Sequence, residues 1–394
     1  MRFRLFVAAI SIATICNAAD FDEIVDSIYS NNIEVKAIEH RLAGDAAAIR
    51  STNNLEATSI DFEYLFGQKA VGDKYAIGIA QGFEWLGVYS SRNKRNNASI
   101  SALTYAATAQ KIGIRQNIEQ ICINLVYINK QIALKRQLQN NMLTLRESYN
   151  KGFNKGEITI IDINKLNITI LDIDRTLKSL YLQQNALFES LKAANSSDGL
   201  TADILNLLTE YPNSGLKDFG YYANIIEHFD PDIRSSQAAG EASKWDASTA
   251  KMQNLPSFAV GYKYVDELGD KFHGITASLS IPIFSNRHKT KSSIAYSIAA
   301  QYATTQLNVS KLTQLSSDYK AALSLQEQIG SYKNALTDEN IAVLNKALNA
   351  SQISLLDYIM EVNFFIEATD NLLSMEHEYH SLLSKINKYS CLIN

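Results

Sequence analysis

The stretch from His273 to Lys291 joins a strand pattern directly to a helix pattern, with only a short polar turn between them. Apolar residues alternate with small or polar ones up to Phe284, at Ile275, Ala277, Leu279, Ile281 and Ile283. That period of two predicts a strand with one apolar face, and Pro282 belongs near its end because proline cannot donate to a sheet. The helical pattern that follows lasts roughly sixty residues, or about 90 Å. Such a layout favours a long, tubular structure over a globular enzyme.

Composition agrees with long uninterrupted elements. The 394 residues include only four prolines and seventeen glycines, and the length allows two or three ordinary domains. The net charge of −4 is nearly balanced, which argues against a nucleic-acid partner.

The N-terminus has the three regions of a secretory signal peptide, which we expect over residues 1–19. Arg2 and Arg4 precede the apolar run Leu5–Ile15, which is too short to span a membrane as a helix. Cys16 raises the alternative of an acylated lipoprotein cysteine, although a bulky Ile15 stands where a small residue is expected.

The sequence matches itself at a shift of 195 residues. Residues Ser90, Arg92, Lys94, Asn150, Ile158 and Asp162 recur as Ser285, Arg287, Lys289, Asn345, Ile353 and Asp357. Such a register rarely persists by chance, so we interpret the chain as a duplication. The expected organisation is a first repeat over 20–194, a joint over 195–216 and a second repeat over 217–394.

Each repeat is expected to have the same order of elements. Short helices are predicted at 21–30 and 219–227, and helices of about 22 residues at 32–53 and 231–253. Strands follow at 58–66, 75–89, 256–266 and 272–284. Long helices are predicted at 93–150 and 288–349, and returning helices at 159–194 and 354–388. The two helical hairpins therefore cover 93–194 and 288–388.

The predicted strands have the length and alternation of membrane strands. One face carries aromatic and aliphatic residues, with Leu279 expected at its centre in the last strand, and the other face carries charges such as Asp61, Glu63 and Lys263. Gly87 is predicted to form a bulge in the second strand. Because four strands cannot close a barrel, two or more chains must combine theirs, giving eight, twelve or sixteen strands. A soluble sandwich with a buried aromatic face is the alternative.

The helices are amphipathic. The long helix and the returning helix carry apolar residues every three or four positions among polar ones, for example at Ile121, Leu125, Ile128, Ile132, Leu166, Ile170, Ile173 and Leu177. These stripes are typical of helix-on-helix packing. With a secretory signal, a periplasmic location of the helical part is expected.

The duplicated order of helix, hairpin, long helix, turn and helix resembles the TolC family of outer-membrane channel-tunnels. Leu255-Pro256-Ser257 is similar to the segment with which the family enters a barrel strand. The segment from Leu279 to Phe284 is similar to the family's exit from strand to helix. Gly156, Thr159 and Asp162 are similar to its periplasmic tip. The second tip keeps Ser354 and Asp357 but has Ser351 where the family usually has glycine, and the first repeat has Ala57-Thr58 where Leu-Pro is expected.

The resemblance implies a mainly helical fold with a shared β-barrel: a homotrimer with twelve strands in the outer membrane and a helical tunnel in the periplasm. It implies docking to a periplasmic adaptor protein and an inner-membrane transporter through tip residues Gly156, Thr159, Ser351 and Ser354. It also implies a periplasmic gate that Asp357 would line, with Asp162 as its counterpart in the first repeat. The alternative for Asp357 is a helix cap. Gly87 and Pro282 mark the barrel exits.

No pattern indicates catalysis. His377 and His380 are three residues apart and could share a helix face, but a solvated last turn explains them as well as a metal site does. No nucleotide motif and no nucleophile–base arrangement stands out, so we expect no enzyme and no cofactor. The predicted function is an exit duct for efflux or type I secretion. A secreted helical rod without a pore is the rival, and the sequence does not indicate the cargo.

Overall fold

The computed structural model describes residues 21–68, 72–196, 199–283, 286, 288–336, 339–350 and 352–392. The predicted signal peptide and Cys16 lie outside these residues. The chain forms two compact units, and each takes segments from both halves of the sequence. One unit contains 21–33, 114–216 and 320–385, and the other contains 34–113, 217–319 and 386–392. We call them the helical unit and the sheet unit.

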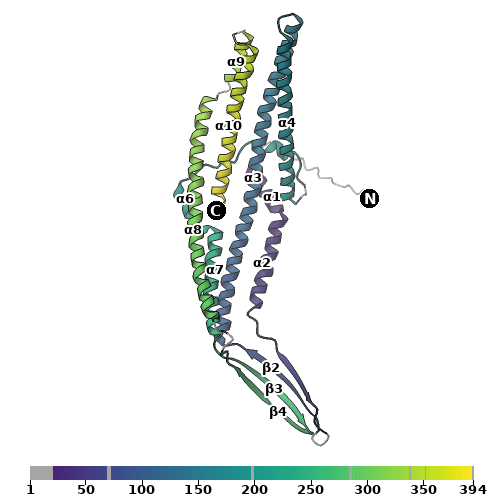
Figure 1. Ribbon diagram of the computed structural model, residues 1–394, viewed down its shortest axis with the longest axis vertical. Coiled ribbons are helices and arrows are strands. Elements are labelled where there is room, and N and C mark those ends of the chain that lie inside the picture. Colours follow the sequence, from purple (N-terminus) through teal and green to yellow (C-terminus); the bar gives the residue numbers. More distant parts are fainter. Residues whose placement is uncertain are drawn as a thin grey trace, which may run out of the picture. The chain divides into compact units, whose positions relative to one another are not determined.

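The sheet unit contains four strands in the order β1-β2-β3-β4, all antiparallel to their neighbours (Figure 1). They are β1 (Ser59–Leu65), β2 (Lys74–Phe83), β3 (Ser257–Glu267) and β4 (Asp270–Ser280). The central pairing, β2 with β3, joins strands that are distant in sequence. The β3–β4 turn places Leu268 and Gly269 at positive φ, 59° and 93°, as a two-residue hairpin turn requires.

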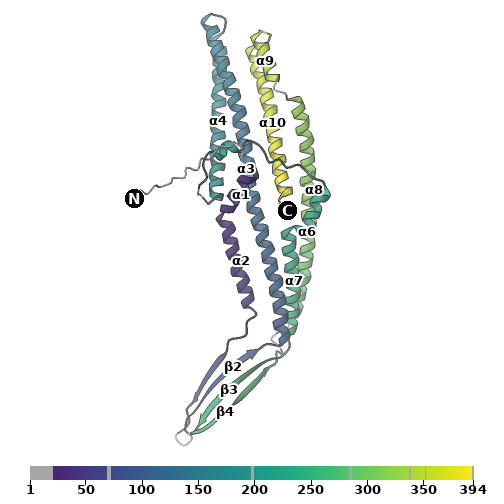
Figure 2. The ribbon, with the colours of Figure 1, turned by 180° about the vertical axis from the view of Figure 1, so that it is seen from behind.

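Three further helices lie wholly or mainly in the sheet unit: α2 (Ile33–Ser51), α6 (Phe219–Phe229) and α7 (Pro231–Met252). Asp230 caps α7, because its Oδ1 accepts from the backbone N–H groups of Asp232 and Ile233, and Pro231 occupies the first turn. Both ribbon views show α7 running beside the first part of α8 (Figures 1 and 2), where Ser236 and Thr304 hydroxyls lie 2.8 Å apart.

The C-terminal segment, which includes η1 (Ser390–Leu392), is anchored in the sheet unit by a buried charge cluster. Lys311 Nζ lies 3.2 Å from Asp230 Oδ2 and 2.5 Å from Asp232 Oδ2, and it donates to the Tyr389 hydroxyl at 3.1 Å. The Asp230 side chain is completely buried, so Lys311 supplies the opposite charge that a buried carboxylate needs.

The helical unit contains α1 (Phe21–Asn31), α4 (Ile160–Ala194), α5 (Ile204–Leu207), α9 (Glu339–Asn349) and α10 (Leu355–Asn387, assigned to this unit through Lys385). Two long helices, α3 (Leu86–Asn154) and α8 (Lys289–Ala335), contribute residues to both units. One core packs the predicted apolar stripes of α3 and α4 together with apolar residues of α10, and it includes Ile128, Met142, Leu166, Ile170, Leu177, Tyr358 and Val362.

A second core in the helical unit fixes α1 and the joint between the repeats. It includes Phe21, Val25, Ile118, Cys122, Leu191 and Leu208. Burial raises the pKa of the Cys122 thiol to about 12, which makes it an inert core residue. Within the described residues, no helix is both long enough and apolar enough to cross a membrane.

The structure corrects three predicted elements. The helix predicted at 288–349 is divided into α8 and α9, which end at Ala335 and begin at Glu339. Thr337 and Asp338 lie outside the described residues, but both are residue types that favour helix starts, a signal that hydrophobic periodicity does not register. The second strand ends at Phe83 and not at 89, and the fourth ends at Ser280 and not at 284.

The end of β2 has a local explanation. The Glu84 backbone N–H donates to the Tyr89 hydroxyl at 3.1 Å, and the Val88 N–H donates to the Trp85 carbonyl at 2.8 Å. Gly87 and Tyr89 thus lie in the first turn of α3, and Trp85 directly precedes the helix. Gly87 is a helix residue, and the predicted bulge at this position is wrong.

Candidate functional site: the sheet and the helix turns

One face of the sheet is apolar across all four strands. The register aligns Ile60, Ile79, Tyr262 and Ile275 in one row, and Phe62, Ile77 and Tyr264 in the row nearer the hairpin turns. All of these side chains except the half-buried Tyr264 are exposed, by 75% at Ile60 and 83% at Ile275. A continuous exposed apolar surface on a sheet is what a lipid-facing wall presents.

Aromatic residues border this apolar face at both ends. Tyr64 and Tyr75 lie towards the hairpin turns, and Phe83 stacks on Phe258 at the other end with ring centroids 5.5 Å apart. Aromatic girdles of this kind mark the two interfaces of a membrane-spanning sheet. Leu279 lies in the row of Phe83 and Phe258, so the prediction that it is central is wrong, and Ile275 occupies the centre of β4.

The opposite face is polar and carries mostly small side chains. Along β2 it presents Ala76, Gly78, Ala80 and Gly82. Lys263 of β3 therefore reaches over β2 to Glu63 of β1, with Nζ 3.2 Å from Oε2. A Cβ on Gly261 would lie 2.5 Å from the Ile79 carbonyl oxygen, so this position requires glycine.

The sheet has two open edges. Among the described residues, β1 pairs only with β2 and β4 only with β3. An unpaired strand edge is not tolerated in hydrocarbon, because its N–H and C=O groups have no partner there. The sheet is therefore incomplete as a membrane structure unless further strands continue it.

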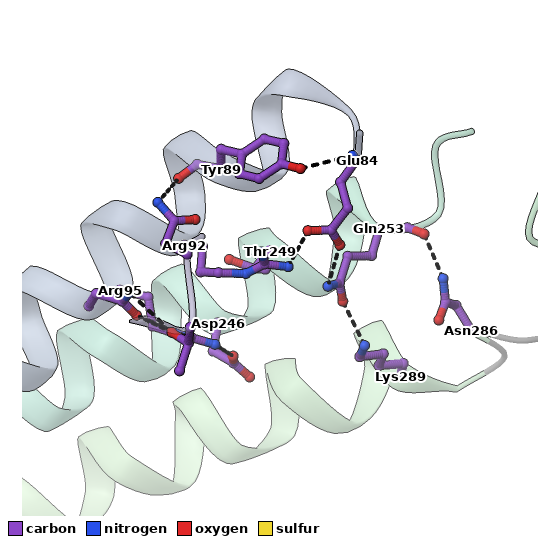
Figure 3. A network of polar contacts seen from close by, with 12 residues as sticks. Glu84, Tyr89, Arg92, Arg95, Asp246, Thr249, Gln253, Asn286 and Lys289 are labelled. Atoms are coloured by element: carbon purple, nitrogen blue, oxygen red, sulfur yellow. Dashed lines mark hydrogen bonds and ion pairs between the residues drawn. The ribbon is translucent and has the colours of Figure 1, made fainter. Parts of the chain in front are cut away.

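A polar network connects the sheet to the helices that follow it (Figure 3). Arg92 Nη2 lies 2.5 Å from Glu84 Oε2, and Gln253 Nε2 donates to Glu84 Oε1 at 3.3 Å. Lys289 Nζ donates to Gln253 Oε1 at 2.6 Å, and Asn286 Nδ2 donates to the Gln253 carbonyl at 2.6 Å. The network links the starts of α3 and α8, which the duplication places at equivalent points.

Pro282 lies just beyond β4, as predicted, and lines a cavity of about 400 Å³ beside this network. The Ile283 N–H donates to the Ile281 carbonyl at 3.0 Å, which turns the chain around Pro282 at the strand exit. Gly87 packs closely against α7, because an added Cβ would lie 3.1 Å from Met252 Sδ. Both predicted exit residues thus shape the connection from sheet to helix, in different ways.

The turn between α3 and α4 has the local structure that its sequence predicts. Gly156 has φ +78°, a conformation that side chains with a Cβ rarely adopt, and its N–H donates to the Phe153 carbonyl at 2.9 Å. Thr159 caps α4: its hydroxyl accepts from the Asp162 N–H at 3.2 Å and donates to Asp162 Oδ2 at 2.6 Å.

The turn before α10 repeats this arrangement. The Ser354 hydroxyl donates to Asp357 Oδ2 at 2.6 Å and accepts from the Asp357 N–H at 3.2 Å, and the Ser354 N–H donates back to the carboxylate at 3.2 Å. These bonds from Ser354 lower the pKa of Asp357, so the carboxylate is charged at neutral pH. Ser351 lies outside the described residues. Among the described residues, no hydrogen bond joins the Thr159–Asp162 pair to the Ser354–Asp357 pair.

The two histidines of α10 are held by aromatic rings. His377 stacks on Tyr127 and lies 2.7 Å from Asn124 Oδ1, while His380 stacks on Tyr211 of the joint, with centroids 4.3 Å apart. Burial lowers the pKa of His380 to about 4. The parts of the chain that the structure describes hold no group of three or more potential metal ligands.

Sequence reasoning missed the junction network and the Lys311 cluster. Arg92 and Lys289 were visible only as members of the 195-residue repeat, which gave no indication of Glu84 or Gln253 as partners. For the Lys311 cluster, the available signal was the pair Asp230-Pro231 directly before a helical pattern, which indicates a helix N-cap at Asp230.

Comparison with known proteins gives matches in structure but not in sequence. No protein-family model matches the chain, and neither does any curated protein sequence. The outer-membrane channel OprN superposes with a TM-score of 0.78 at 14% identity, covering 94% of this chain and 89% of that one. The outer membrane protein VceC from Vibrio cholerae has a TM-score of 0.73 at 13% identity, covering 94% and 95%. The CmeC outer membrane channel of Campylobacter jejuni has a TM-score of 0.70 at 15% identity, covering 94% and 85%.

These matches extend over nearly the whole chain and over most of each channel, so they concern the complete arrangement of hairpins and helices. The resemblance that the sequence predicts is confirmed at the level of the fold: this chain has the fold of the outer-membrane channels.

Proposed function

We propose that the protein is an outer-membrane exit duct of the TolC type, a passive conduit for efflux or secretion. The observation that carries this proposal is the four-stranded sheet with one exposed apolar face, one polar face and two open edges. The apolar face meets lipid, the polar face lines water, and the open edges pair with other copies. The fold shared with OprN, VceC and CmeC supports the same function.

Three copies complete the barrel in this proposal, giving twelve strands in the outer membrane. The helices stand in the periplasm, where polar surfaces between their apolar stripes meet water. Energy comes from elsewhere: a periplasmic adaptor protein docks on the helix turns, and an inner-membrane transporter drives the cargo. No residue of the chain is assigned a catalytic or cofactor-binding role.

Extraction and reconstitution test the duct against its rival. We expect a heat-resistant oligomer that leaves outer membranes only with detergent and forms discrete conductance steps in planar lipid bilayers. The rival, a secreted or periplasmic helical rod of structural or adhesive function, predicts a water-soluble protein without conductance. Recovery of a water-soluble monomer from the periplasm or the medium would exclude the duct.

The adaptor-docking residues are a finer proposal. Gly156, Thr159 and Ser354 belong to or adjoin the turns before α4 and α10, and Ser351 precedes Ser354 by three residues in the sequence. Gly156→Val places a branched side chain at φ +78°, where space is free but the backbone is strained. Oligomer assembly should persist while export falls. A photo-crosslinker at Thr159 should capture an adaptor, and the same crosslinker in the hairpin turn at Leu268 serves as the control. Capture only at Leu268 would reverse the proposed polarity.

The gate is the second finer proposal. Three Asp357 carboxylates around the channel axis would attract cations and multivalent blockers. The cap geometry of Asp357 is shared by Asp162, so capping alone predicts equal effects of the two substitutions. Single-channel recordings of Asp357→Asn and Asp162→Asn separate the roles. If Asp357→Asn loses cation preference and Asp162→Asn keeps it, the result supports the gate. If cation selectivity is unchanged in both variants, helix capping is the whole role of Asp357.

A further inference from the structure

The polar face of the sheet changes in side-chain size along its length. In the half nearer the helices it presents Ser59, Ala80, Gly82, Ala259, Gly261, Thr276, Ser278 and Ser280. In the half nearer the hairpin turns it presents long side chains among three small residues, Ala76, Gly78 and Gly274; the long ones are Asp61, Glu63, Leu65, Lys74, Lys263, Val265, Glu267, Asp270 and Phe272. The face is therefore nearly smooth at one end and covered by long side chains at the other.

Phe272 is the exceptional residue of this face. On β4 it shares the polar face with Gly274, Thr276, Ser278 and Ser280, and it is the only large apolar residue among them. Its side chain is 58% exposed, with Val265 as its direct partner on β3. Leu65 on β1 and Val265 on β3 also lie on this face, and Phe272 is its one aromatic residue within the four strands.

The Glu63–Lys263 ion pair lies on the same part of the face. Lys263 and Glu63 extend over β2 from opposite sides, above Gly78 and Ala76, and both side chains are about half exposed. An ion pair of this kind holds two long side chains across the sheet surface. Together with Phe272 it places long side chains over β1, β2 and β4 in this half of the wall.

We propose that Phe272, with the Glu63–Lys263 pair, forms a size filter just inside the outer mouth of the channel. This inference rests on the proposed function, which places the hairpin turns outside the cell and the polar face around the lumen. A twelve-stranded barrel has a backbone diameter of roughly 24 Å, from strands about 4.8 Å apart and a tilt of about 40°. Threefold symmetry puts the three phenyl rings at one level and the three ion pairs at a neighbouring one, and together they occupy a substantial part of that opening. The filter excludes bulky solutes from the medium while smaller cargo leaves.

Cysteine labelling from outside intact cells tests the filter. Ser278→Cys places a thiol on the smooth half of the wall, about 20 Å further along the strand than Phe272 at 3.3 Å per residue. A small membrane-impermeant maleimide should label it, and a maleimide carrying a polyethylene glycol chain of several kilodaltons should label it slowly. Adding Phe272→Gly should speed labelling by the large reagent about tenfold, with little effect on the small one. Adding Thr276→Gly, which removes a side chain from the same face, is the matched control.

The outcomes separate the filter from the channel itself. If the large reagent labels Ser278→Cys at the same rate with and without Phe272→Gly, the size filter is overturned while the proposal of a water-filled channel stands. If the small reagent fails to label Ser278→Cys in a correctly assembled oligomer, the polar face is not a water-filled lumen, and the proposed function falls as well. Preferential labelling of Leu279→Cys, one residue further on, would overturn both proposals in the same way. The parent chain, labelled in parallel, measures the contribution of its own thiols.

Discussion

An arginine at Ile275 is the most direct test of the membrane face. Ile275 is 83% exposed, lies midway along β4 and belongs to the row of Ile60, Ile79 and Tyr262. At the bilayer midplane an arginine on the lipid face of a barrel strand costs about 2–4 kcal/mol, and near an interface about 0–1 kcal/mol. Ile275→Arg should therefore cost about 3 kcal/mol per copy, or more than a hundredfold in the folding equilibrium.

Two neighbours on β4 serve as matched controls for Ile275→Arg. Leu279→Arg lies on the same face but beside the aromatic border, so its cost should be about 0–1 kcal/mol. Thr276→Arg points to the polar face and should assemble normally. The assay is urea-dependent refolding into lipid vesicles, followed by the heat-modified oligomer band on gels. If Ile275→Arg and Thr276→Arg are tolerated equally, the argument that one face of this sheet meets lipid is refuted.

Three further predictions concern stability. Gly261→Ala should destabilise the sheet by about 1–3 kcal/mol, because its Cβ would lie 2.5 Å from a backbone carbonyl oxygen of β2; Gly274→Ala, which has open space, should be neutral in the same refolding assay. Burial lowers the pKa of His380 from 6.5 to about 4, so as the pH falls its imidazole is protonated in the unfolded chain before it is protonated in the folded one. Stability should therefore fall by roughly 3 kcal/mol between about pH 6.5 and pH 4, and His380→Phe should lack this loss in thermal unfolding followed by circular dichroism. Lys311→Met removes the ion-pair partner of the buried Asp230 carboxylate, with Lys388 as the remaining nearby cation, and should cost about 3–5 kcal/mol, with rescue by Asp230→Asn; an unchanged melting temperature in the single mutant would contradict this role.

The sequence was most informative where local periodicity decides the structure. Alternation placed Ile60, Phe62 and Ile275 on one face, and the register of the sheet confirms that grouping. The returning helix predicted at 159–194 begins at Ile160, with Thr159 as its cap. This start could be predicted because Thr159 and its partner Asp162 are only three residues apart. Local signals of this kind need no knowledge of distant contacts.

The errors and omissions have a physical cause as well. Trp85, Gly87 and Tyr89 fit a strand alternation, but in the structure the helix starts at Leu86, with the Glu84 N–H bonded to the Tyr89 hydroxyl and Gly87 packed against Met252 of α7. The Glu84–Arg92 pair and its link through Gln253 join segments more than 150 residues apart, and nothing in either segment specifies the other. Partners of this type become visible only when the pairing of β2 with β3 brings the segments together.

The pairing of β2 with β3 has a consequence for how such a chain evolves. It joins the second strand of the first repeat to the first strand of the second, and in the proposed closed ring the free edge of β4 would meet β1 of a neighbouring copy in the same relation. The β2–β3 pairing, an internal seam within one chain, thus corresponds to the β4–β1 pairing, the seam between neighbouring copies. A chain with a single hairpin would need six copies to close the proposed twelve-stranded ring, whereas the duplicated chain needs three. Residues at the internal seam, such as Gly261 and Lys263, can then differ from those at the seam between copies. Duplication thus allows asymmetry inside such a ring without loss of closure.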